Sequence, residues 1–250
     1  MQARHRTAFS VMGTTASIHV NDDISDDDFR VLTYAVQSEL ERLEQMFSVY
    51  RPSSEISRIN AGELNLLDAS QEVVDVLDAC TWMEQVSNNV FTIRPNTFSS
   101  EINPTGFVKG WAAERASRLF TDAGITHWYL GVGGDFVTGG GLDDHTPWTI
   151  GIIDPRDSTV CVGEVQVFTG AVATSGVAER GQHIWASDGS FAQSPFLSVT
   201  VSGPSLTWAD AFATTVFAMG EAGIDWIQQF ELYSVLPIRH DDVSEQDLQS

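Results

Sequence analysis

"VKGWAAERASRLFTDAGITHWYLGVGGDFVTGG", residues 108–140, joins one helical pattern to two strand patterns. Gly124 ends the helical part, as a glycine commonly does just past the last turn of a helix. From His127 onward the residues alternate around glycines, which predicts a strand, a glycine turn and a second strand. A helix that leads into an antiparallel pair of strands is typical of the α+β class.

Outward from this stretch, predicted helices gather early in the chain and predicted strands gather late. The helix over 25–50 has Ser25 as its N-cap, followed by an acidic first turn and apolar residues at helical spacing. Further helices are predicted over 53–62, 70–89, 207–220 and 221–230, and strands over 8–20 (broken near Gly13), 148–155, 160–176, 181–189, 195–205 and 232–242. Without a linker or composition break, residues 1–250 are expected to form one α+β domain, with mixed or antiparallel sheets packed against helices.

The composition limits what the protein binds and where it works. A formal net charge of −21 over 250 residues argues against nucleic-acid binding and repels anionic ligands at long range. An anion would need a local device such as backbone N–H groups, a lysine or a divalent cation. Cys80 and Cys161 are expected to be free thiols, with Cys161 buried in a strand. With no signal peptide and no long apolar run, we expect a cytoplasmic protein without a transmembrane segment.

Two glycine- and hydroxyl-rich segments are candidates for anion binding. Residues 131–141, "GVGGDFVTGGG", predict either a tight hairpin or a phosphate cradle, and the strand-like residues after the turn favour the hairpin. Residues 174–176, "TSG", predict either a nest of backbone donors or a turn with a hydroxyl cap. His183 follows in a strand-like context, where it is either a structural side chain or a catalyst.

Asp210 stands in a helix of small and apolar residues, with Thr214 one turn later. That spacing places the carboxylate and the hydroxyl on one helical face. A buried carboxylate needs a partner, and a hard divalent cation is one that its oxygens suit. The alternative is an aspartate that caps the helix, with the threonine bonded to a carbonyl of the preceding turn.

Lys109 is the one lysine among 13 basic side chains of this sequence, the others being arginines. A compact ammonium differs from a guanidinium where space is tight or where a point charge meets phosphate oxygens. Gly106 and Gly110 flank it, and the pattern places it at a helix start, where an anion would offset the unfavourable dipole. The alternative is chance placement of a single lysine.

Six ordered blocks together resemble the ApbE family of FAD:protein FMN transferases. The blocks are "VMGTTASIHV" (11–20), "FSVYRPSSEISRIN" (47–60), "NPTGFVKGWAAERA" (103–116), "YLGVGGDFVTGG" (129–140), "AVATSGVAERGQHI" (171–184) and "ADAFATTVFAMG" (209–220). The resemblance implies an enzyme that uses FAD and Mg²⁺, transfers FMN to a threonine hydroxyl of an acceptor flavoprotein and releases AMP.

The resemblance also assigns roles to residues of this sequence. Flavin or FAD contacts are implied for Met12, Asn103, Lys109, Thr174 and His183, catalytic roles for His183 and Asp210, and metal binding for the Gly106 carbonyl, Asp210 and Thr214.

The sequence departs from the family pattern near the flavin. Asn103 and Thr92 stand where relatives commonly carry aspartates, and the segment after His183 lacks the usual proline. The metal pair, the lysine and the histidine are retained. Two alternatives to transfer are an FAD pyrophosphatase, which would yield free FMN and AMP, and a protein that only binds FAD.

Overall fold

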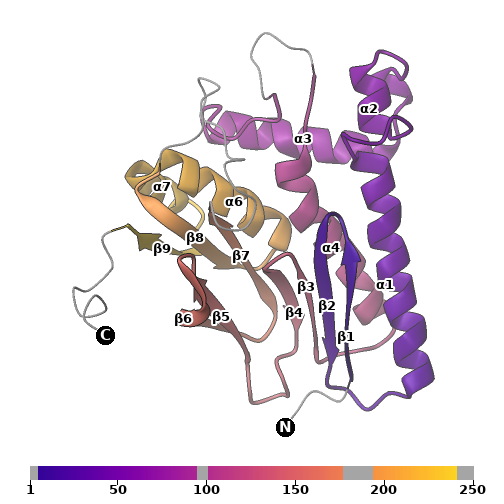
Figure 1. Ribbon diagram of the computed structural model, residues 1–250, viewed down its shortest axis with the longest axis vertical. Coiled ribbons are helices and arrows are strands. Elements are labelled where there is room, and N and C mark those ends of the chain that lie inside the picture. Colours follow the sequence, from indigo (N-terminus) through magenta and orange to yellow (C-terminus); the bar gives the residue numbers. More distant parts are fainter. Residues whose placement is uncertain (1–4, 95–100, 177–193, 241–250) are drawn as a thin grey trace.

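The computed structural model describes residues 5–94, 101–176 and 194–240 (Figure 1). Its strands are β1 (His5–Val11), β2 (Thr14–Val20), β3 (Trp128–Val132), β4 (Asp135–Gly139), β5 (Trp148–Asp154), β6 (Asp157–Val167), β7 (Gly170–Gly176), β8 (Phe196–Gly203) and β9 (Ser234–Arg239). Its helices are α1 (Asp26–Phe47), α2 (Glu55–Asn60), a 3-10 turn (Leu66–Asp68), α3 (Gln71–Val86), α4 (Thr105–Asp122), α6 (Leu206–Met219) and α7 (Glu221–Ile227).

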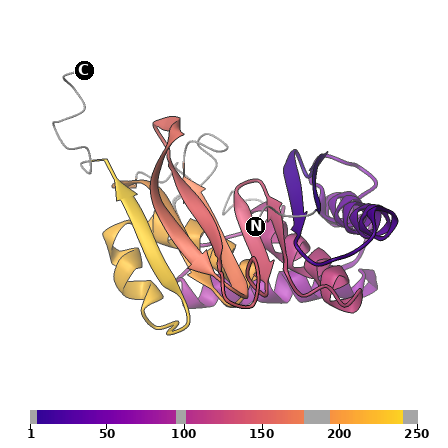
Figure 2. The same cartoon turned by 90° about the horizontal axis from the view of Figure 1, so that it is seen from below.

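The described strands form one antiparallel sheet of seven in the order β1-β2-β3-β4-β7-β8-β9, with β5 and β6 paired separately. Figure 2 shows the helices on one face of the sheet and the β5–β6 hairpin rising from the other. Trp148 and Ile150 of β5 pack with Val172 of β7 and with aromatic side chains of β3 and β4. The predicted α+β class with antiparallel strands packed against helices is confirmed.

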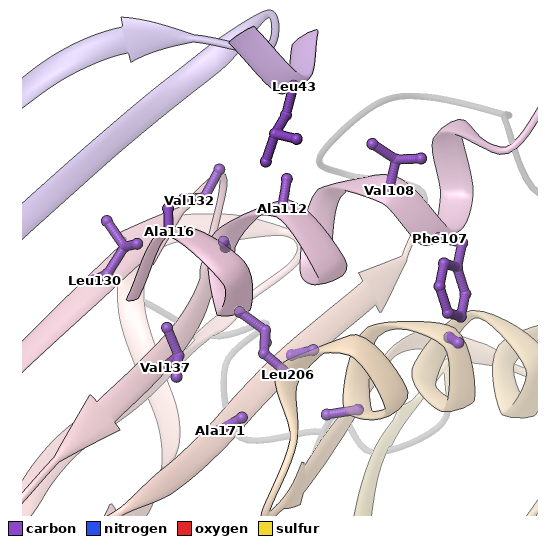
Figure 3. Packing of buried hydrophobic residues seen from close by; sticks show 14 of the residues in the cluster. Leu43, Phe107, Val108, Ala112, Ala116, Leu130, Val132, Val137, Ala171 and Leu206 are labelled. Atoms are coloured by element: carbon purple, nitrogen blue, oxygen red, sulfur yellow. The ribbon is translucent and has the colours of Figure 1, made fainter. Parts of the chain in front are cut away.

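The main core lies between the sheet and helices α1, α4 and α6 (Figure 3). Small residues on α4, such as Ala112 and Ala116, are fully buried and allow the helix to approach its neighbours closely. Phe107 on the same helix is also fully buried, which contributes about 1.5–3 kcal/mol by removal of its ring from water. Helix α4 is therefore the central element on which other parts of the molecule pack.

The structure corrects the prediction for one glycine-containing turn and confirms the prediction for another. The segment 8–20, predicted as one broken strand, is a hairpin: β1 and β2 pair from His5↔Val20 to Val11↔Thr14. Met12 (φ 53°) and Gly13 (φ 70°) form its turn. Between β3 and β4, Gly133 and Gly134 have φ of 58° and 90°, so the hairpin prediction for 131–141 is confirmed.

Three details of the sequence interpretation are wrong. Helix α4 begins at Thr105, so Lys109 lies in its second turn and not at its start. Residues Thr174–Gly176 form neither a nest nor a turn, because they belong to β7 and pair with β8. Cys161 is free as expected but exposed, because both faces of β6 are largely open at that point.

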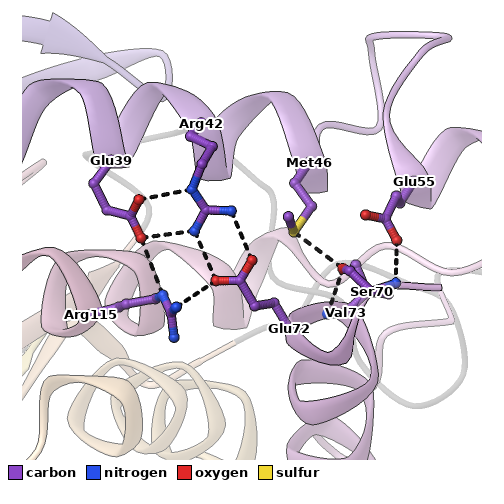
Figure 4. A network of polar contacts seen from close by, with 8 residues as sticks. All are labelled: Glu39, Arg42, Met46, Glu55, Ser70, Glu72, Val73 and Arg115. Carbon is purple, nitrogen blue, oxygen red and sulfur yellow. Dashed lines mark hydrogen bonds and ion pairs between the residues drawn. The ribbon is translucent and has the colours of Figure 1, made fainter.

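An ion-pair network joins α1, α3 and α4 (Figure 4). Arg42 binds Glu39 through two bonds of 2.8 Å and Glu72 through two more of 2.8 Å. Arg115 reaches the same two carboxylates at 3.2 Å and 2.7 Å. Three helices far apart in sequence are thus fixed to one another by four side chains.

No helix within the described ranges has both the length and the apolar character required to cross a bilayer.

Candidate functional site

A carboxylate on α4 caps the start of α6 and so aligns the two helices. Glu114 of α4 accepts hydrogen bonds from the Ser205 hydroxyl (2.7 Å), the Thr207 N–H (2.8 Å) and the Thr207 hydroxyl (2.7 Å). Ser205 precedes α6 without capping it through its own side chain. Glu114 therefore satisfies the start of α6 and sets its position along α4.

One turn before Glu114, Gly110 allows the two helices to touch. A Cβ at this position would lie 2.8 Å from the Cβ of Asp210 and 2.8 Å from the Leu206 carbonyl oxygen. The Gly110 N–H donates to Asp210 Oδ2 at 3.0 Å. In a regular α-helix this N–H faces the carbonyl of Gly106, one turn earlier. The contact therefore brings Asp210 to the turn of α4 whose Gly106 carbonyl the family resemblance implies for metal binding.

The ammonium of Lys109 lies between two buried carboxylates. Its Nζ is 2.5 Å from Asp135 Oδ2 and 3.6 Å from Asp210 Oδ1. Asp135 is fully buried and Asp210 is 3% exposed, so both ion pairs are shielded from water. Lys109 is thus explained by a tight buried site for a point charge and not by chance placement or a helix start.

Asp135 is the member of this cluster that the sequence analysis missed. It is the first residue of β4, directly after the Gly133–Gly134 turn, and its Oδ1 accepts the Thr174 N–H at 3.0 Å. Burial raises the pKa of its carboxyl to about 7, Lys109 opposes that rise and Asp210 adds to it. The sequence feature that could have indicated Asp135 is a single acidic residue in an otherwise apolar and glycine-rich hairpin.

Hydroxyl groups on β7 form two hydrogen-bonded pairs, one with α6 and one with β8. Ser175 Oγ is 3.0 Å from Thr214 Oγ1, and Thr174 Oγ1 is 2.9 Å from Thr200 Oγ1. Asp210 lies in the second turn of α6 and does not cap it, and the threonine that bonds back to a carbonyl is Thr215. The capping alternative for Asp210 and Thr214 is therefore wrong.

The residues assigned to a cation fit a hard divalent ion. Asp210 supplies a carboxylate and Thr214 a hydroxyl one turn away, while the Gly106 carbonyl lies on the turn of α4 that Asp210 contacts. In the described ranges no three His, Cys, Asp or Glu side chains are grouped as metal ligands. A cation here would thus depend on one carboxylate with neutral oxygens, a donor set of the kind that Mg²⁺ accepts.

A cavity of about 170 Å³ opens beside Lys109. Its wall includes Met12 and Gly13 from the β1–β2 turn, Phe47 at the end of α1, and Val108 with Lys109 on α4. We call it the Met12 cavity. Met12 and Lys109, two of the predicted ligand contacts, therefore line the same cavity.

A larger cavity of about 590 Å³, here the Asn103 cavity, adjoins it. Val49 and Tyr50 line both cavities, and the Tyr50 ring is 88% exposed at their junction. Together they offer the volume of a typical cofactor site. The Met12 cavity has mainly apolar walls, whereas the Asn103 cavity mixes apolar side chains with polar ones such as Asn60 and Glu101.

Asn103 and Thr92, where the resemblance leads us to expect aspartates, both bond to neighbouring residues. Asn103 Oδ1 accepts the Thr105 N–H (3.1 Å) and the Thr105 hydroxyl (2.5 Å) at the start of α4. Thr92 donates to Glu84 at 3.0 Å. Of the predicted site residues, Lys109 and Asp210 meet directly, while Met12 and Asn103 line the neighbouring cavities. His183 lies outside the described residues.

Comparisons with solved structures agree with this architecture. The flavin transferase ApbE from Vibrio cholerae has a TM-score of 0.81 at 21% identity, over 95% of this chain and 94% of that one. The ApbE protein from Thermotoga maritima has a TM-score of 0.81 at 21% identity, over 98% of both chains. The apo flavinyl transferase ApbE from Pseudomonas stutzeri has 0.77 at 19%, over 94% of both chains.

A comparison with curated protein sequences finds no significant match. The sequence profile of the ApbE family matches residues 12–100 and 94–236, which is most of the chain. The profile and the shared fold lead to one conclusion: this chain belongs to the ApbE family.

Proposed function

We propose that this protein is an FAD:protein FMN transferase, which uses Mg²⁺ and moves FMN from FAD to a threonine hydroxyl of an acceptor flavoprotein. The observation that carries the proposal is the position of Lys109. Its side chain lines the Met12 cavity, while its ammonium lies with the buried carboxylates of Asp135 and Asp210. A ligand with an aromatic ring system and a Mg²⁺-bound pyrophosphate suits these two adjoining environments, because the metal offsets the negative charge that remains on the two carboxylates.

In this proposal the flavin ring occupies the cavities that Met12 and Tyr50 line, and Lys109 directs the pyrophosphate toward Asp210. Asp210, Thr214 and the Gly106 carbonyl would hold the Mg²⁺, and Asn103 and Thr174 would contact the FAD. A bound Mg²⁺ supplies positive charge against the pyrophosphate, which a chain of net charge −21 otherwise repels. The chain's own residues bind and orient the reacting groups, the main requirement of phosphoryl transfer.

The reaction replaces a phosphoanhydride bond of FAD with a phosphoester bond to the acceptor. The acceptor threonine oxygen bonds to the phosphorus of the FMN half, the bond from that phosphorus to the bridging oxygen breaks, and AMP leaves with that oxygen. His183 is proposed, from the family resemblance, to take the threonine proton, a role worth about 10² to 10⁴ in rate.

The test is incubation with FAD, Mg²⁺ and an acceptor flavoprotein, followed by chromatography for AMP and mass spectrometry of the acceptor. We expect AMP together with an acceptor heavier by one FMN, and neither product after chelation of the metal. Asp210→Asn should lose both products. Asp225→Asn, the same change at an exposed position of α7, should retain them.

Three results would contradict the proposal in different ways. Free FMN with AMP and no adduct would identify a pyrophosphatase. Retained FAD with neither product would identify a binding protein. Full activity of Asp210→Asn would remove the proposed metal site.

A further inference from the structure

The two buried carboxylates lie at unequal distances from the Lys109 ammonium. The Lys109 ammonium is 2.5 Å from Asp135 Oδ2 but 3.6 Å from Asp210 Oδ1. Since the strength of an ion pair falls with distance, Asp135 is the stronger partner of the ammonium. The Asp210 carboxylate is correspondingly less neutralised by it.

Asp135 is fixed in place from the sheet side. It is fully buried, it follows the turn that Gly133 and Gly134 form, and its second oxygen accepts the Thr174 N–H at 3.0 Å. Lys109 comes from the helical layer on α4. The sheet thus determines where the end of a flexible four-carbon side chain lies.

The charges of the cluster indicate what this arrangement achieves. Above about pH 7, where both carboxylates are ionised, two negative charges share one positive charge, and one negative charge is left for a further cation. Without the charge of Asp135, the ammonium would move toward Asp210, the other carboxylate with which it pairs among the described residues. It would then compete with a divalent cation for the same oxygens.

We propose that Asp135 is a positioning residue, which holds Lys109 away from close pairing with Asp210 and so leaves the Asp210 carboxylate available to a divalent cation. The inference rests on the metal site of the proposed function and adds a residue that acts on this site through another. In this role Asp135 acts through Lys109 and is not itself a ligand of the metal.

The test measures binding of Mn²⁺ alone, without FAD, from the loss of the electron paramagnetic resonance signal of the free ion. Asp135→Asn keeps an oxygen for the Thr174 N–H and removes the charge. We expect it to weaken Mn²⁺ binding about 10- to 100-fold, as loss of a residue that orients a metal ligand commonly does. Lys109→Met, which removes the competing ammonium, should bind Mn²⁺ at least as tightly as the wild type.

The double variant separates positioning from a direct effect. In the Lys109→Met background there is no ammonium to direct, so Asp135→Asn should change Mn²⁺ affinity less than about threefold, a strongly non-additive result. Equal losses in both backgrounds would overturn the inference. Weaker Mn²⁺ binding by Lys109→Met than by the wild type would also overturn the inference. This measurement tests the inference even if Asp135→Asn does not fold.

Asp210→Asn distinguishes this inference from the proposed function. It should abolish Mn²⁺ binding. If it does so while Asp135→Asn binds normally, the inference alone is wrong. If the wild type binds no Mn²⁺, or Asp210→Asn binds it unchanged, the metal site is wrong and the inference is overturned with it.

Discussion

Gly110 is the residue at which the packing of the site leaves no room for a side chain. An alanine Cβ there would lie 2.8 Å from both the Asp210 Cβ and the Leu206 carbonyl oxygen. Backbone atoms on α6 cannot rotate away as a flexible side chain can, so the helices would have to separate. We expect Gly110→Ala to lower the free energy of unfolding by about 1–3 kcal/mol, measured by urea denaturation.

Gly106→Ala is the matched control for stability, since it lies one turn earlier on α4 and its Cβ would meet nothing within 4 Å. It should leave the free energy of unfolding unchanged or raise it by up to about 1 kcal/mol through helix propensity. If both alanine variants are equally stable, α4 and α6 are not in the close contact described.

At this scale the sequence predicted the chemistry of individual residues better than their partners. Asp210 with Thr214 follows from helical spacing, and the lone Lys109 from composition. Asp135 was missed because nothing in its neighbourhood along the chain indicates Lys109, which reaches it from another layer. Likewise, the local pattern around Thr174 predicts either a nest of backbone donors or a turn with a hydroxyl cap, whereas its N–H donates to Asp135 of another strand.

Among the elements, the network on α1, α3 and α4 gives a prediction that depends on pH. Bonds from Arg42 hold the pKa of Glu72 below its ordinary value of 4.5, assisted by Arg115. A lowered pKa means that the carboxylate stabilises the fold at pH values above 4.5, and that this stabilisation is lost as the pH falls through the lowered pKa.

We therefore expect Glu72→Gln to lower the free energy of unfolding by about 1 kcal/mol near neutral pH. The difference from the wild type should shrink in strongly acidic buffer, where Glu72 is protonated in both the folded and the unfolded chain. Urea titrations at several pH values measure it. Glu231→Gln removes the same charge at an exposed position and should leave the free energy of unfolding unchanged at every pH. If the effect of Glu72→Gln on this free energy did not depend on pH, the ion pairs of Glu72 would not be its cause.

Periodicity and caps were sufficient to predict most elements, because these signals are local. Ser25 caps α1 through the N–H of Asp28 as its position indicates, and the glycine turn between β3 and β4 is a hairpin. Boundaries and exposure were less predictable. The start of α4 at Thr105 depends on Asn103, and the exposure of Cys161 depends on a β6 that pairs with β5 alone.

For the whole molecule, the net charge of −21 makes a prediction about the approach of FAD. Repulsion between the acidic protein and the anionic ligand should slow association at low ionic strength. Raising the salt from about 20 mM to about 300 mM shortens the Debye length from roughly 20 Å to less than 10 Å. The association rate constant for FAD, measured by stopped-flow flavin fluorescence, should therefore rise with salt.

Riboflavin is the matched control, because it carries the same ring system without phosphates, and its association rate should change little with salt. If the association rate constant for FAD falls as the salt concentration rises, attraction by the local field near Lys109 outweighs repulsion by the acidic surface.

The pairing of β2 with β3 has a consequence for the way this chain is made. Val20 pairs with Trp128 and Ala16 with Val132, so the two strands are separated by more than a hundred residues of sequence. At ribosomal speeds of about 5–20 residues per second, β3 emerges roughly 5–20 s after the β1–β2 hairpin. Over that interval the inner edge of β2 stands open, and a second nascent chain could add a strand to it. Slower translation would lengthen the interval, so we expect the yield of correctly folded protein to fall when synthesis is slowed.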